Sequence, residues 1–175
     1  MRSRYTFTDY SPDWPLAFEQ EAARLRELLG DDLVAIHHIG STSVPGLAAK
    51  PIIDLLPVAR SVLAIEAKTP QLEAAGYRYW GEYGLPGRRY FTRDQDGHRT
   101  RNIHIYGVGD PDIERHLAFR DYLRAHPAVR DQYAAIKRAA YVRYPADIDG
   151  YSDSKHDWIQ TVEAQAVAWY QQARA

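Results

Sequence analysis

A hydroxyl-rich turn between two short apolar runs holds the residues best suited to chemistry. The first run is short enough to be a buried strand, and the chain then turns through Gly40, Ser41 and Thr42. Small residues let backbone amides approach an anion without steric hindrance. The second run, 52–58, contains Asp54, and a buried strand seldom holds an ionised acid unless a metal ion, a cation or several donors offset its desolvation. The pattern therefore predicts a site for phosphate and a divalent metal ion.

Each candidate residue of this stretch also has a structural interpretation, as an alternative to a role in binding a ligand. Lys50 stands between the turn and the second run, where it either neutralises phosphate charge or lies in solvent before Pro51. Asp54 either binds a metal ion, pairs with a buried arginine or caps a neighbouring loop. The hydroxyls of the turn can instead cap a short helix that begins near Val44. That alternative is compatible with phosphate binding, because a helix N-terminus attracts anions.

Two further residues are candidates to complete a metal site or to act as an acid or base. His104 lies in a run that alternates with period two, so it points away from the face that Ile103 and Ile105 share. A neutral imidazole can bind a metal ion or act as a general base, although a lone strand histidine is more often structural. Glu82, in a glycine-rich loop, either supplies a second carboxylate or is merely solvated. We expect Asp54, His104 and Glu82 to form the catalytic and metal-binding set.

Cations and tyrosines later in the chain are candidates to hold a phosphorylated ligand. Guanidinium groups suit bidentate phosphate contacts, and strand alternation lets only one of Arg88 and Arg89 face inward; we expect Arg88 to contact phosphate. Two tyrosine–lysine pairs are four residues apart and share a helix face where the chain is helical: Tyr133 with Lys137, and Tyr151 with Lys155. These side chains either cover apolar surface with the lysine stems or lie over the cleft and hold a base and its phosphates.

The expected elements place these residues on a sheet that is followed by helices. A cap at Ser11-Pro12-Asp13 and apolar residues at helical spacing predict a first helix, which Gly30 ends. The later elements are strands 33–38 and 52–58, a helix over 62–75 interrupted near residue 69, strands 77–80, 89–92 and 101–106 with a hairpin turn at Asp96-Gly97, and helices 112–125, 128–144 and 151–173. The fold class is α/β or α+β.

Length and composition describe an ordinary globular chain. With 175 residues, 45% of them hydrophobic and 26% charged, we expect one domain over 1–175, with a sheet-containing core over 1–108 and a helical part over 109–175. A formal net charge of −1 gives no electrostatic footprint for nucleic acid or an anionic membrane. Without cysteine, disulfides, thiolate nucleophiles and cysteine-based zinc sites are excluded. The lack of an apolar leader or membrane-length run favours a cytoplasmic protein, and nothing indicates its oligomeric state.

Two levels of resemblance start from the hydroxyl-rich turn. Gly40-Ser41 followed by Asp54 resembles the nucleotidyltransferase signature, in which a Gly-Ser turn precedes an Asp-x-Asp strand and the acids hold metal ions for in-line attack. Leu56 stands where the second acid belongs. The chain closely resembles the GrpB family, small cytoplasmic proteins of nucleotidyltransferase-like fold. The resemblance covers nearly the whole chain and is carried by His38–Asp54, Tyr10–Trp14, Gly84–Phe91, His104, Phe119–Arg124, Tyr133 with Lys137, and Tyr151 with Lys155.

The resemblance implies a nucleotidyltransferase-like mixed β-sheet flanked by helices, with a C-terminal helical cap. It also implies binding of a nucleotide or another phosphorylated small molecule with Mg²⁺ or Mn²⁺, and transfer of a nucleoside monophosphate to a small acceptor. The alternative, favoured by Leu56, is a non-catalytic module for a nucleotide or a coenzyme-A-related ligand. A hydrolase that uses His104 as its base is a third class. A similar domain is fused to dephospho-coenzyme-A kinase in some bacteria, which points to nucleotide or coenzyme A metabolism.

Overall fold

A five-stranded mixed sheet forms the centre of the computed structural model, which describes residues 5–175. Its strands are β1 (Leu33–Ile39), β2 (Ile53–Ala59), β3 (Tyr77–Tyr79), β4 (Arg89–Gln95) and β5 (His98–Gly107). Their spatial order is β1-β2-β5-β4-β3, with β2 and β5 parallel and the other neighbours antiparallel. The predicted fold class is confirmed, and the β4–β5 hairpin turns at Asp96-Gly97, where both residues have positive φ.

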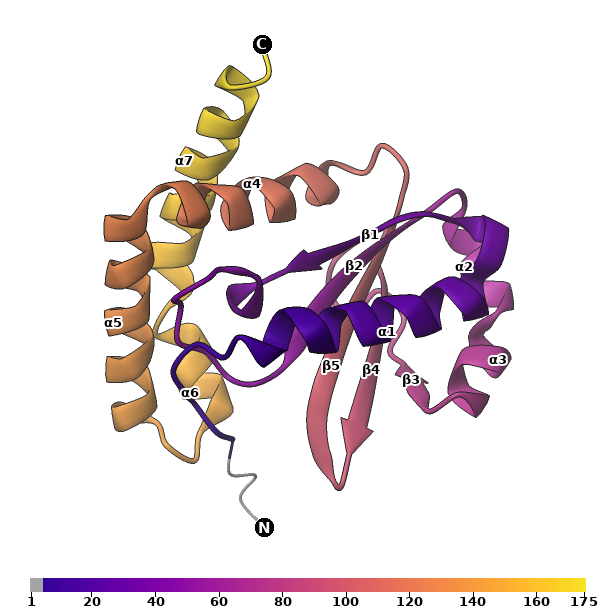
Figure 1. Cartoon of the computed structure of the whole chain (residues 1–175), viewed down its shortest axis with the longest axis horizontal. Helices are drawn as coiled ribbons and strands as arrows, with labels where there is room; N and C mark the ends of the chain where they lie inside the picture. The colour runs from indigo at the N-terminus through magenta and orange to yellow at the C-terminus, as the bar shows by residue number, and fades with distance from the viewer. Residues whose placement is uncertain (1–4) are drawn as a thin grey trace.

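Helix α1 (Asp13–Leu29) covers one face of the sheet (Figure 1). It begins where the Ser11 hydroxyl accepts a hydrogen bond from the Asp13 amide at 3.2 Å, and it ends at Gly30, whose φ is +56°. The apolar side of the helix packs against side chains of the strands, among them Leu55 and Ile103. These contacts form the largest part of the core and fix which face of β2 and β5 is buried under α1.

The opposite face of the sheet is apolar at one end of β2 and polar at the other. Side chains alternate, so Asp54, Leu56 and Val58 share this face. Helix α4 (Pro111–Ala125) packs over its apolar end, where Leu56 and Val58 form a small core with Tyr106 of β5. Asp54 lies at the other end of the strand, beyond the reach of that core.

Three C-terminal helices stand beside this end of the sheet (Figure 1): α5 (Pro127–Arg143), α6 (Ile148–Asp153) and α7 (His156–Gln172). The prediction of one long helix over 151–173 is wrong, because α6 ends before α7 begins. The hydroxyls of Ser152 and Ser154 donate to the carbonyls of Ile148 and Tyr151 at 2.9 and 2.8 Å. Such local side-chain bonds compete with continuation of the helix. Lys155 therefore lies in the joint between two helices.

Of two shorter segments, the first confirms the predicted interruption of a helix and the second differs from an expected element. The interrupted helix over 62–75 is two helices, α2 (Val62–Ala67) and α3 (Thr69–Ala74), which pack on the α1 side of the sheet. After β1 the chain forms the short 3₁₀ turn η2 (Ser41–Ser43), and Val44 is already extended, so the helix considered near Val44 does not begin there. The segment that follows β1 is therefore a tight turn and not the start of a longer helix.

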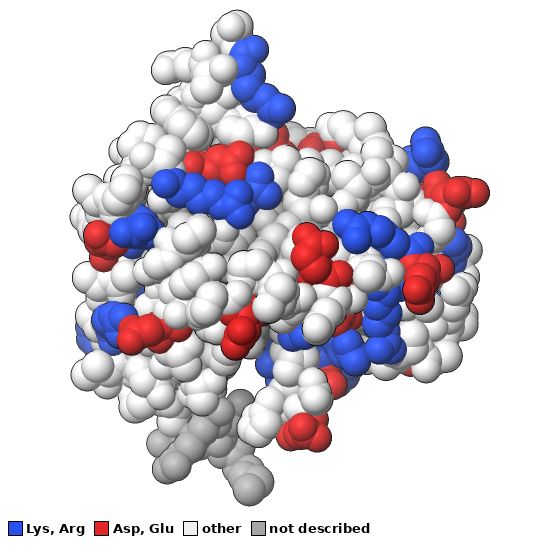
Figure 2. All heavy atoms as spheres, viewed as in Figure 1, with Lys and Arg blue, Asp and Glu red and all other residues white. Residues whose placement is uncertain are grey.

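Charged side chains of both signs share the face of the molecule that Figure 2 shows. On the face seen in Figure 2, lysine and arginine side chains are interspersed with aspartate and glutamate side chains. Within residues 5–175, no helix combines the length and the hydropathy needed to cross a membrane.

Candidate functional site

A cleft of about 300 Å³ lies between the polar end of the sheet and the C-terminal helices. Its floor comes from η2, β2 and β5, and its walls come from α4, α5, α6 and α7. Nine of the eleven predicted site residues line it: Gly40, Ser41, Thr42, Lys50, Asp54, His104, Tyr133, Lys137 and Lys155. The two that do not are Glu82 and Arg88.

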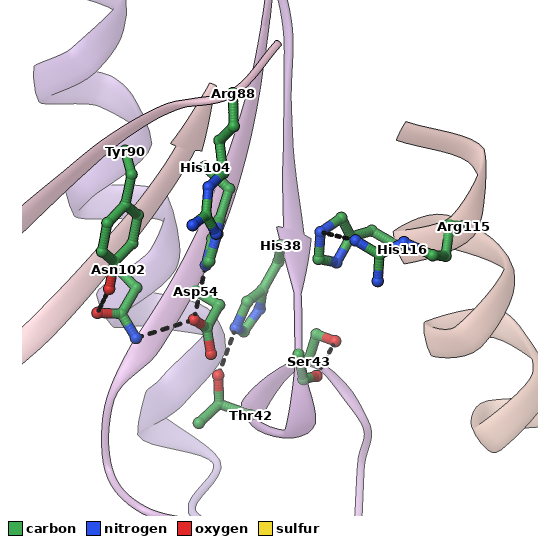
Figure 3. A network of polar contacts seen from close by, with 11 residues as sticks. His38, Thr42, Ser43, Asp54, Arg88, Tyr90, Asn102, His104, Arg115 and His116 are labelled. Atoms are coloured by element: carbon green, nitrogen blue, oxygen red, sulfur yellow. Dashed lines mark hydrogen bonds and ion pairs between the residues drawn. The ribbon is translucent and has the colours of Figure 1, made fainter. Parts of the chain in front are cut away.

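Asp54 is held in a fixed orientation by two residues of β5 (Figure 3). Its Oδ1 accepts a hydrogen bond from Asn102 Nδ2 at 3.1 Å and another from His104 Nε2 at 3.1 Å. The β2–β5 register places Asn102 directly opposite Asp54, and His104 lies two residues further on the same face. The Asp54 side chain keeps 25% of its surface exposed, so the carboxylate faces the cleft and is not locked to an arginine.

Arg88 determines which nitrogen of His104 carries the proton. The Arg88 guanidinium donates to His104 Nδ1 from Nη1 at 3.2 Å, so Nδ1 is an acceptor and the hydrogen sits on Nε2, facing Asp54 (Figure 3). Arg88 also donates to the carbonyls of Glu82 and Tyr83, at 3.1 and 2.7 Å. With these bonds made and only 6% of its surface exposed, Arg88 positions His104 and does not reach the cleft as the predicted phosphate ligand.

Glu82 does not join Asp54 and His104. Its Oε1 accepts the Gly87 amide at 2.8 Å and lies 3.6 Å from the Arg89 guanidinium, and its side chain is 54% exposed. These contacts stabilise the glycine-rich loop and keep the Glu82 carboxylate away from Asp54. The predicted set Asp54, Glu82 and His104 is thus not brought together, and residues 5–175 hold no group of three or more histidines and acids placed to bind a metal ion.

The turn η2 packs directly against Asp54. Gly40 has φ +71°, and a Cβ atom there would lie 2.6 Å from Asp54 Oδ2, so only glycine lets the turn approach the carboxylate so closely. The Thr42 hydroxyl is already bonded to His38 Nε2 at 2.9 Å. Burial lowers the pKa of His38 to about 4, and its ring stacks on Phe18 of α1. Gly40, Ser41 and Thr42 all line the cleft, and the Thr42 side chain also anchors the turn to His38.

Three lysines lie around the opening above Asp54. Lys50 Nζ and Lys155 Nζ lie 5.2 and 4.3 Å from the centre of the Tyr151 ring, and Lys137 Nζ lies 4.4 Å from that of Tyr133. Burial lowers the pKa of all three, and Asp54 partly counteracts it. The pKa of Lys155 falls to about 8 and that of Lys137 to about 6, because like charges add to burial.

Several lining residues escaped the sequence-based prediction. Asn102 shares a strand face with His104, so the same alternation that singled out His104 also points to it. His116 of α4 lies with its ring centre 5.6 Å from that of His104, and burial holds the pKa of His116 well below its usual range. Glu163 of α7 also lines the cleft but pairs with Arg115 at 2.9 Å. His116 and Glu163 come from helices whose placement no local pattern reveals.

The donor chemistry around Asp54 does not fit Mg²⁺ or Mn²⁺ held by protein ligands. Such ions take oxygen ligands, yet the two side chains bonded to Asp54 present N–H groups to it, and the three lysines that line the same cleft carry amines. The oxygen of the Asn102 amide accepts the Tyr90 hydroxyl at 2.9 Å. At the position of a second acid, Leu56 is fully buried against Ile39 and Val58.

Comparison with known proteins identifies the family. The chain belongs to the GrpB family, since the family described as "GrpB protein" matches residues 4–165. UPF0157 protein YqkA of Bacillus subtilis is 46% identical over 160 residues, 91% of this chain and 46% of YqkA. A dephospho-CoA kinase of Mycolicibacterium paratuberculosis is 31% identical over 183 residues, 90% of this chain and 45% of the kinase. The chain therefore spans about half the length of each of these relatives.

Solved structures support the same family and a wider fold. Conserved protein GrpB from Enterococcus faecalis superposes with a TM-score of 0.91 at 40% identity, covering 95% of this chain and 99% of that one. The Cid1 poly(U) polymerase bound to MgGTP superposes with a TM-score of 0.54 at 15% identity, covering 78% of this chain and 44% of that one. The predicted nucleotidyltransferase-like fold is therefore confirmed. At 15% identity, the likeness extends to the fold alone.

Proposed function

We propose that this chain binds a nucleotide or another phosphorylated small molecule in the cleft, with its phosphates against Lys50, Lys137 and Lys155. The observation that supports this most strongly is the Lys137 ammonium. It is 2% exposed, lines the cleft, and has no hydrogen-bond partner among residues 5–175. A buried amine without a hydrogen-bond partner is costly whether or not it is protonated, so a site that keeps one is suited to receive an anion that would pair with its charged form.

The other lining residues suit the rest of such a ligand. Asp54, oriented by Asn102 and His104, lines the cleft, where its carboxylate can accept a hydrogen bond from a ligand hydroxyl such as that of a ribose. The rings of Tyr133 and Tyr151 offer aromatic surface beside the lysines. The site thus combines cations for phosphate, one acceptor for a hydroxyl and apolar walls for an uncharged part.

Transfer of a nucleoside monophosphate to a small acceptor is the second candidate. It is favoured by the fold shared with Cid1, a poly(U) polymerase, and by Asp54, which can accept the proton of an attacking hydroxyl. Binding without turnover fits the geometry better, because Leu56 fills the place of the second acid and lies in the core. The dephospho-CoA kinase relatives extend the candidate ligands to coenzyme A and its precursors.

The test is equilibrium binding to a panel of phosphorylated molecules by calorimetry: ATP, UTP, coenzyme A and dephospho-coenzyme A, with adenosine and pantetheine as unphosphorylated counterparts. We expect saturable binding of at least one phosphorylated member, about tenfold weaker or more in Lys155→Met. Lys68→Met is the matched control, because it removes the same charge from a lysine outside the cleft, paired with Asp32. If no phosphorylated member binds, or both variants bind alike, the proposal is wrong.

Turnover is tested on the same samples. Pyrophosphate released from ATP or UTP in the presence of a metabolite extract would support transfer, and orthophosphate would support hydrolysis. Saturable binding with neither product supports the binding module. Asp54→Asn separates the roles, since it should weaken binding of a hydroxylated ligand more than binding of inorganic phosphate chains.

A further inference from the structure

Lysine is used very unevenly in this chain. The sequence has only four lysines against eighteen arginines, and three of the four line one cleft. These three lysines belong to separate segments of the chain: Lys50 precedes β2, Lys137 lies on α5, and Lys155 lies between α6 and α7. Figure 1 shows α5 and α6 gathered beside the end of the sheet where β2 begins. The tertiary fold, not local sequence, builds the cluster.

The three ammonium groups face aromatic rings, not acids. None of them forms an ion pair with an acid within residues 5–175, and the described ion pairs of α4 and α7 use arginine instead. Cation–π contacts with Tyr133 and Tyr151 hold the lysines in place without neutralising them. The three amines are therefore left without an anionic partner from the described residues, and a bound anion can take that place.

We propose that Lys50, Lys137 and Lys155 take the place that divalent metal ions occupy in metal-dependent phosphate sites, so that this cleft binds phosphate chains without a metal ion. The inference rests on the proposed function, since it concerns how the same cleft neutralises its ligand. Glu163 also lines the cleft but is paired with Arg115, so the three ammonium groups and the Asp54 carboxylate leave a formal charge of +2 when all three lysines are protonated, the charge of one divalent ion. The donors around Asp54, which suit no such ion, support the same conclusion.

Lysine differs from a metal ion in that its charge depends on the ligand. Burial and the neighbouring lysines lower the pKa of Lys137 to about 6 and that of Lys155 to about 8 in the empty cleft. A bound phosphate chain raises both pKa values, because it favours the charged amines. Binding at pH 8 should therefore take up protons from the buffer, whereas a metal-mediated site has no such requirement at these lysines.

The experiment measures binding of sodium tripolyphosphate to the full chain by calorimetry at pH 8.0. One series contains EDTA and one contains Mg²⁺ in excess of the probe, and each is repeated in two buffers that differ in ionisation enthalpy. We expect binding in EDTA with net proton uptake, weakening when Mg²⁺ occupies the phosphate oxygens. Lys137→Met should weaken binding about tenfold or more and reduce the uptake. Lys68→Met should change neither.

Each alternative outcome separates this inference from the proposed function. Binding that appears only with Mg²⁺ overturns the inference and leaves the proposed function standing. Binding in EDTA that Lys137→Met does not weaken also overturns it, because the cluster would then not be the binding element. If tripolyphosphate fails to bind in both series, the inference falls, and the panel of phosphorylated molecules decides separately whether the proposed function falls with it. Circular dichroism of each variant shows whether it has folded.

Discussion

Replacing Lys137 by methionine should make the protein more stable, by an amount that depends on pH. Burial lowers the pKa of Lys137 from 10.5 to about 6, so between these values the unfolded chain binds more protons than the folded one. The free energy of unfolding of the wild type then rises with pH, by at most about 1.4 kcal/mol per unit. Methionine keeps the length of the side chain without the titration. The advantage of Lys137→Met should therefore shrink by about 3 kcal/mol from pH 7 to pH 9.

Urea unfolding of both proteins at pH 7, 8 and 9, followed by tryptophan fluorescence, measures this difference directly. For a chain of this size, about 1 kcal/mol corresponds to roughly 2–4 °C in melting temperature, so thermal unfolding offers a second readout. Lys68→Met removes a partly exposed ion pair with Asp32 and should lower stability by a small amount that stays constant over this range. A Lys137→Met advantage that does not change with pH, or a loss of stability at pH 7, would refute the reasoning.

Three other substitutions test the geometry of the cleft. Gly40→Ala should lower the free energy of unfolding by about 2 kcal/mol and weaken ligand binding, whereas Gly81→Ala, with a similar φ but open space around it, should lower it by only about 1 kcal/mol; urea unfolding compares them. Arg88→Met should free His104 to exchange tautomers, seen as a change in its ¹⁵N imidazole shifts by NMR. Leu56→Asp should destabilise the protein by about 3 kcal/mol or more without creating a Mg²⁺ site, checked by unfolding and by calorimetric titration with Mg²⁺.

Much of the cleft floor was predictable because strands impose a strict alternation on side chains. That period placed His104 on the face opposite Ile103 and Ile105, and the structure puts both isoleucines in the core and His104 against Asp54. Applied to residue 102, the same rule would also have identified Asn102. The positions of Gly40 and Ser41 beside Asp54 follow from a tight turn that joins paired strands.

The two site residues that lie outside the cleft, and the helix boundary at Lys155, depend on contacts that the sequence does not reveal. Glu82 and Arg88 share a glycine-rich loop whose backbone carbonyls take up the arginine, and nothing in their spacing reveals this. Lys155 reaches the cleft because α6 and α7 break apart before it, whereas propensity favoured one continuous helix. The helical cap as a whole was expected, but which of its faces meets the sheet is decided by packing.

The choice of lysine over arginine in the cleft has a physical reason. A guanidinium stays charged when buried, so an arginine at position 137 would place a permanent unpaired charge in the empty site. Lysine can lose its proton there and regain it when an anion arrives, so the empty cleft holds less uncompensated charge. The structural arginines of α4 instead have fixed acceptors, since Arg120 and Arg124 bond the carbonyls of His38 and Ser43. Lys137→Arg should therefore fail to restore the wild-type behaviour even though it restores the charge: the folded protein should be less stable without ligand, and tripolyphosphate binding should no longer take up a proton at this position.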